Sequence, residues 1–146
     1  MNTNNIVQDF DFARYLKSQT SDYDGDYSEV LQLTSEIYYL CTIMVYNKDI
    51  SQNQKNMLYK SIAYFLLPHD VYSENIHGVK GYLDDVMLCL YVLNLISKRH
   101  IDVLYENWIL KPSQLDKLLN EDFDILRREN KELFEDVLLE VGIENN

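Results

Sequence analysis

The chain has 146 residues, of which 47% are hydrophobic, and its formal net charge at pH 7 is −11. This length favours one domain with a single core, and this share of hydrophobic residues excludes a wholly disordered chain. The negative charge repels phosphate backbones, so direct binding of nucleic acid is not expected and a basic protein partner is favoured.

The N-terminal third of the chain predicts two helices joined by an acidic turn. Residues 1–5 are polar and are expected to fray, whereas residues 6–16 carry apolar side chains at helical spacing. The turn-like segment 18–27 precedes a second helix over residues 28–46. Apolar side chains recur there every three or four residues, which is typical of a helix with one buried face.

The middle of the chain predicts a long connection between two helices. Residues 58–66 have an apolar face, and Pro68 is expected to end that helix because the residue before a proline avoids helical dihedral angles. Residues 83–98 are apolar on nearly all sides, so this helix should lie at the centre of the fold. Its most apolar run, residues 86–96, is shorter than the ~20 residues that a membrane span needs, so we expect no membrane insertion.

The C-terminal third predicts two short helices and a helical tail. The short helices cover residues 101–110 and 114–119 and are separated by Pro112, with Ser113 as the expected cap of the second.

The tail over residues 121–141 has an apolar face that polar residues 127–131 interrupt, so it forms either one long helix with a weak middle or two helices. Gly142 is its expected stop, and residues 143–146 are expected to fray. The chain therefore predicts a single all-α domain of five to seven helices around the apolar helix 83–98.

Cys41 and Cys89 lie in apolar helical stretches and outside any metal-ligand spacing. We interpret both as small buried hydrophobic side chains, which suits a reducing compartment. The N-terminus has neither the basic start nor the apolar core of a signal peptide, so we expect a cytoplasmic protein.

Ionisable and turn-forming residues gather between Tyr64 and Asp85, in a connection of about fifteen residues that exceeds the usual length between packed helices. One interpretation is structural, because Asp84 and Asp85 begin an apolar helix where carboxylates accept unpaired backbone N–H groups. The residues that we single out, as either structural or functional positions, are Pro68, Asp70, Gly81, Tyr82, Asp84 and Asp85.

The other interpretation is a divalent metal site for an ion such as zinc or manganese, built from His69, Asp70, His77, Asp84 and Asp85. Such a site could support hydrolysis by general acid–base chemistry. The spacing matches no established metal motif, so the leading expectation is that the protein has no catalytic residues and no cofactor.

The same segment carries the pattern Tyr64-Phe65-x-x-Pro68-x-Asp70-Val71-x-x-Glu74, then Gly78-x-x-Gly81-Tyr82-x-Asp84-Asp85. Over about residues 60–98 this pattern resembles the core of the YkvA-like domain, a family of unknown function. Ser73 stands where the family usually has a second proline. The resemblance implies a small bacterial or archaeal helical protein in which Asp70, Asp84 and Asp85 match the acidic motif, and it assigns no catalytic residue.

Three functional hypotheses follow. The first is a non-enzymatic protein–protein interaction module, an accessory or regulatory subunit of a bacterial multiprotein system, with phage defence or counter-defence as one setting. The net charge, the twelve tyrosines and the amphipathic tail favour it, and a homo-oligomer is compatible with it. The alternatives are a metal-binding or metal-dependent hydrolytic domain that uses the 69–85 loop, and an acidic inhibitor that mimics nucleic acid.

Overall fold

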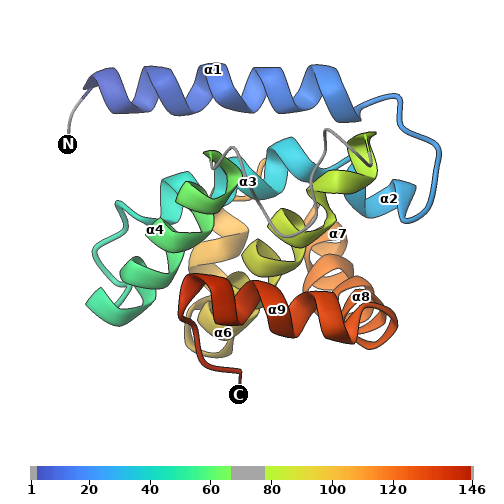
Figure 1. Ribbon diagram of the computed structural model, residues 1–146. Helices are drawn as coiled ribbons and strands as arrows, with labels where there is room; N and C mark the ends of the chain where they lie inside the picture. The colour runs from blue at the N-terminus through green and yellow to red at the C-terminus, as the bar shows by residue number, and fades with distance from the viewer. Residues whose placement is uncertain (1–2, 67–77, 146) are drawn as a thin grey trace.

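The computed structural model describes residues 3–66 and 78–145, which form an all-α fold (Figure 1), as the sequence predicts. Its helices pack around one long central helix, α6. In chain order the elements are α1 (Thr3–Thr20), α2 (Ser28–Leu31), α3 (Thr34–Met44), α4 (Gln52–Leu66), the 3₁₀ helix η1 (Gly78–Tyr82), α6 (Leu83–Asn107), α7 (Pro112–Lys117), the π-helical turn η2 (Leu118–Asp122), α8 (Phe123–Glu129) and α9 (Lys131–Val141).

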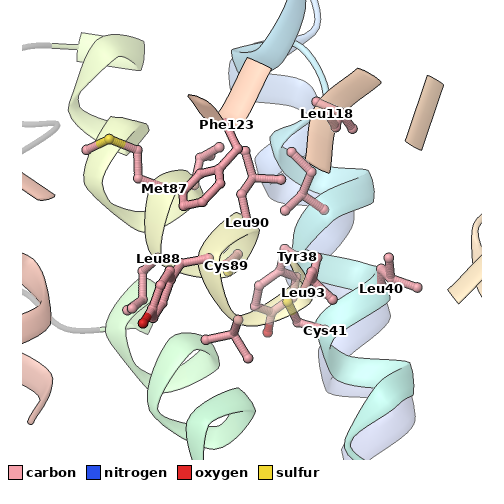
Figure 2. Close-up of a cluster of buried hydrophobic side chains, with 14 of the residues drawn as sticks. Tyr38, Leu40, Cys41, Met87, Leu88, Cys89, Leu90, Leu93, Leu118 and Phe123 are labelled. Atoms are coloured by element: carbon pink, nitrogen blue, oxygen red, sulfur yellow. The ribbon is translucent and has the colours of Figure 1, made fainter. Parts of the chain in front are cut away.

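Helix α6 lies at the centre because its first half is apolar on nearly every side, apart from Asp84 and Asp85. All residues from Leu83 to Leu93 are buried, and α3, α4, η2, α8 and α9 pack against them. Helix α1 lies across the outside of α3 (Figure 1). Each fully buried aliphatic side chain in this core contributes about 1.5–3 kcal/mol to folding. Figure 2 shows part of it, with Tyr38, Leu40, Cys41, Met87, Leu88, Cys89, Leu90, Leu93, Leu118 and Phe123 labelled.

The predicted boundary between helices 83–98 and 101–110 is present as a kink inside α6. At His100, φ is −130° and ψ is 35°, so two helical segments meet there, and the second ends at Asn107. Among the described helices, none combines the length and the apolar character that crossing a bilayer requires.

The predicted helix 28–46 is divided into α2 and α3 at Gln32 and Leu33. The hydroxyl of Thr34 donates a hydrogen bond to the carbonyl of Leu31 at 2.6 Å. Such a local side-chain bond competes with the regular helical bonding of the backbone. The apolar spacing continues across the break, so periodicity alone does not reveal it.

The C-terminal tail forms two helices, which resolves the alternative that the sequence leaves open. The break falls at Asn130, where φ is −128° and ψ is 42°. Its side-chain amide donates to the carbonyl of Leu126 at 3.0 Å, and the same carbonyl accepts the backbone N–H of Asn130 at 2.9 Å. Helix α9 ends as predicted at Gly142, whose φ of 70° is the left-handed conformation that glycine adopts without strain.

The expected cap at Ser113 is wrong. Helix α7 begins at Pro112, two residues before the predicted start at Gln114, and no side chain caps its N-terminus. Proline suits the first helical position because its fixed φ is already helical and its missing N–H needs no partner there. Ser113 therefore falls inside the helix.

Residues 143–145 pack against the helices, in contrast to the expected fraying. Ile143 is buried, the hydroxyl of Tyr91 donates to the carbonyl of Glu144 at 2.8 Å, and Arg127 Nη2 donates to Asn145 Oδ1 at 2.8 Å. The segment is mostly polar in sequence, but the Ile143 side chain is buried, and the Glu144 carbonyl and the Asn145 side-chain amide oxygen accept hydrogen bonds. These contacts explain why the segment packs against the helices.

Candidate functional site

The structure describes the two ends of the segment in which we predicted a site. Four candidates, Pro68, His69, Asp70 and His77, lie outside the described residues. The other candidates are close together at the start of α6, and all of them are buried: Gly81, Tyr82, Asp84 and Asp85.

Asp84 joins α6 to α4 from within the core. Its side chain is completely buried, and its Oδ2 accepts a hydrogen bond of 2.7 Å from the hydroxyl of Tyr64 on α4. Its Oδ1 accepts the backbone N–H of Asp85 at 3.0 Å. Hydrogen bonds to a charged group are worth about 1.5–3 kcal/mol each, which offsets part of the cost of burying a carboxylate.

The capping interpretation of the two aspartates is therefore met in part. Asp84 does accept one backbone N–H in the first turn of α6, where such groups have no helical partner. The residue that precedes the helix, Tyr82, makes no side-chain cap. Asp84 also binds Tyr64, twenty residues earlier in the chain, so its role is not limited to its own helix.

Asp85 lies one helical turn before Cys89, and both side chains are buried. Burial raises the pKa of the Cys89 thiol well above its usual range, and a hydrogen bond with Cys41 and the negative charge of Asp85 raise it further. The two cysteines are thus buried, as predicted, and they also meet across the contact between α3 and α6. A thiol held protonated in this way is a poor nucleophile and a poor metal ligand.

Aromatic rings connect this region to the outer helices. The ring centroids of Phe12 and Tyr38 are 5.0 Å apart, those of Tyr38 and Phe65 are 5.2 Å apart, and those of Phe65 and Tyr82 are 6.4 Å apart. The row links α1, α3, α4 and η1. The first two pairs are edge-to-face, and each such contact adds about 0.5–1.5 kcal/mol beyond the burial of the rings.

The metal interpretation gains no support from residues 3–66 and 78–145. Within these ranges, no group of three or more His, Cys, Asp or Glu side chains is placed to hold an ion. Asp84 and Asp85 are the two described members of the proposed ligand set, and Asp84 is engaged by Tyr64. The geometry of Asp84 is that of a buried structural carboxylate.

A second arrangement of acids, on the outer face of α9, was not singled out from the sequence. Helical spacing of three and four residues places its members on one exposed face, which we call the α9 ridge. Leu139 is the most exposed large hydrophobic residue among those described, at 82%. The ridge consists of Glu132, Glu135, Asp136, Leu139 and Glu140.

A signal for the ridge is present in the sequence. The apolar stripe of the tail passes through Phe134, Val137 and Leu138, and Leu139 falls outside it among acids. An apolar residue on the polar face of an amphipathic helix is a departure from the pattern that a solvated helix requires.

Comparisons of the chain with family models, with curated proteins and with solved structures found no match. The similarity to the YkvA-like domain therefore stays a prediction from the residues quoted above.

Proposed function

We propose that this protein is a non-enzymatic interaction module, an accessory or regulatory subunit of a bacterial multiprotein system, and that it binds its protein partner through the α9 ridge. The observation that carries the proposal is the position of Leu139, which is 82% exposed and surrounded by carboxylates. Because the Leu139 side chain is so exposed, it adds little to the packing of the hydrophobic core.

An apolar centre with a polar rim is the usual anatomy of a protein interface. Burial of a leucine side chain against a partner contributes about 1.5–3 kcal/mol, which is enough to make it an important anchor. Val137 and Leu138 already attach α9 to the core, so the ridge is held in a fixed helical conformation before any partner arrives.

The charge of the ridge specifies the partner further. Glu135, Asp136 and Glu140 are all exposed and lie within one or two helical turns of Leu139. A basic surface would be attracted to them and to the net charge of −11, which accelerates association at low salt. We therefore expect a basic partner and an association rate that falls as salt rises.

A mimic of nucleic acid would also bind a basic surface, but it would present charge alone. Leu139 at the middle of the ridge favours a partner that offers an apolar pocket as well as basic side chains.

Affinity purification from the native host tests the proposal. The tagged wild-type protein should co-purify with a defined protein that mass spectrometry identifies, and Leu139→Asn should lose that protein. Ile109→Asn is the matched control, because Ile109 is also strongly exposed, at 61%, but lies outside the ridge. A monomer without co-purifying protein under gentle conditions, or equal recovery with both variants, would contradict the proposal.

A further inference from the structure

A groove of about 310 Å³ lies between α2 and α8. Its apolar lining comes from Tyr27, Val30, Ile125 and Leu126, and two carboxylates, Glu29 and Asp122, line it as well. This volume is at the lower end of the range for ligand sites, which suits one long side chain better than a cofactor. Ile125 remains 39% exposed, so the apolar lining is accessible from outside.

Tyr27 holds one wall of the groove in place. Its backbone is left-handed, with φ of 59° and ψ of 32°, a conformation that a bulky residue adopts only when its surroundings enforce it. Its hydroxyl donates to Glu129 Oε1 at 2.8 Å and accepts from Asn130 Nδ2 at 3.2 Å. The groove is therefore a fixed feature of the junction between α2 and the C-terminal helices.

An internal lysine shows which chemistry the two carboxylates accept. The ammonium of Lys117, on α7, lies 3.1 Å from Glu29 Oε2 and 2.9 Å from Asp122 Oδ1. Among the ion pairs of the described residues, the two acids share this one cation, so one negative charge is left over. The Lys117 and Glu29 side chains are 45% and 83% exposed, so this pair is weak and replaceable, whereas the Asp122 side chain is 13% exposed and its pair with Lys117 is more sheltered.

We propose that this groove binds an arginine side chain of a basic partner protein, with the aliphatic part against Val30 and Ile125 and the guanidinium between Glu29 and Asp122. Arginine fits better than lysine because its planar head carries five donors, which can serve two carboxylates at once, and because it is less strongly hydrated. The inference rests on the proposed function, since it names a side chain that the basic partner should present.

The probe for this inference is butylguanidinium chloride, which reproduces an arginine side chain without the rest of a partner. Titration into the ¹⁵N-labelled full chain should shift the backbone amide resonances of residues 27–30 and 122–126, with a dissociation constant on the order of 10 mM. Butylammonium, guanidinium without an aliphatic chain, and butanol should each bind more weakly.

Two variants make the test decisive. Lys117→Gln removes the competing internal cation and should bind the probe about two- to fivefold more tightly, and Glu29→Gln should bind it about two- to fivefold more weakly. Lys131→Gln on α9 and Glu106→Gln on α6 are the matched controls; both side chains are exposed and lie outside the groove and the ridge, so both variants should bind like the wild type. Glu29 is so exposed that its replacement should leave the fold intact.

Absence of shifts in the groove, or equal affinities in the wild type and the Lys117→Gln and Glu29→Gln variants, would overturn the inference. A different result would contradict the proposed function: in the purification from the host, the Leu139→Asn and Ile109→Asn variants would recover the partner equally well. Because the probe experiment uses no partner, the two failures are distinguishable.

Discussion

The start of α6 and the outer face of α9 both carry clustered carboxylates, but the first cluster is buried in the core and the second is exposed to water. Asp84 and Asp85 are buried, and Asp84 is bound by a tyrosine hydroxyl and a backbone N–H. The α9 ridge places its acids in water around an exposed leucine. The difference teaches that carboxylates clustered inside the core serve the fold, whereas carboxylates clustered in water around an apolar side chain are accessible to a partner.

The largest effect is expected at the buried cluster. Asp84→Ala leaves the Tyr64 hydroxyl without its acceptor and opens a small cavity, so it should lower the free energy of unfolding by about 3 kcal/mol. Urea unfolding followed by circular dichroism measures this change. Tyr64→Phe should cost about 2 kcal/mol, because the buried Asp84 carboxylate loses one hydrogen bond, and the double variant should cost less than the sum of the two. A cost below 0.5 kcal/mol for Asp84→Ala would show that the buried acid is not structural.

The next-largest effect is expected on the way the free energy of unfolding depends on pH. The pKa of Cys89 is raised in the folded protein, chiefly by burial, so the folded state keeps a proton that the unfolded state releases above about pH 9. Stability that is fully present below that pH is therefore lost as pH rises, with a slope of up to about 1.4 kcal/mol per pH unit.

Cys89→Ala should remove this part of the slope between pH 9 and pH 10, although it also lowers stability at every pH. Urea unfolding at a series of pH values gives the slope. An unchanged slope in Cys89→Ala would mean that another group, such as Tyr27, whose pKa burial also raises, dominates the alkaline loss.

The smallest effect on stability is expected on the ridge. Glu135→Gln combined with Asp136→Asn should change the free energy of unfolding by less than about 0.5 kcal/mol, because both side chains are exposed. The same variant should slow association with the partner at low salt and leave it nearly unchanged at high salt. A destabilisation as large as that of Asp84→Ala would remove the contrast between the two clusters.

Much of the fold follows from hydrophobic spacing. The run from Val86 to Leu93 is apolar on all sides and predicts the central helix, and Gly142 predicts the end of α9. The breaks at Leu33 and Asn130 were harder to predict, because non-helical dihedral angles and local side-chain hydrogen bonds mark them while the apolar spacing continues. Apolar periodicity contains no information on such bonds.

The candidate site was predictable in location but not in role. The sequence places Asp84 at the start of an apolar helix, so its burial could be predicted. Its hydrogen bond with Tyr64 could not be predicted, because a contact between residues twenty positions apart depends on how α4 packs on α6. Leu139 was available to pattern analysis, since it interrupts the polar face of α9.

The bond from Tyr27 to Glu129 spans 102 positions of the chain. During synthesis, the first wall of the α2–α8 groove leaves the ribosome long before the second. Contacts of such separation form late, because the intervening chain must first be ordered. The groove therefore forms only when the whole helical bundle has folded. A partner that binds the groove would bind the fully folded protein and not the nascent chain.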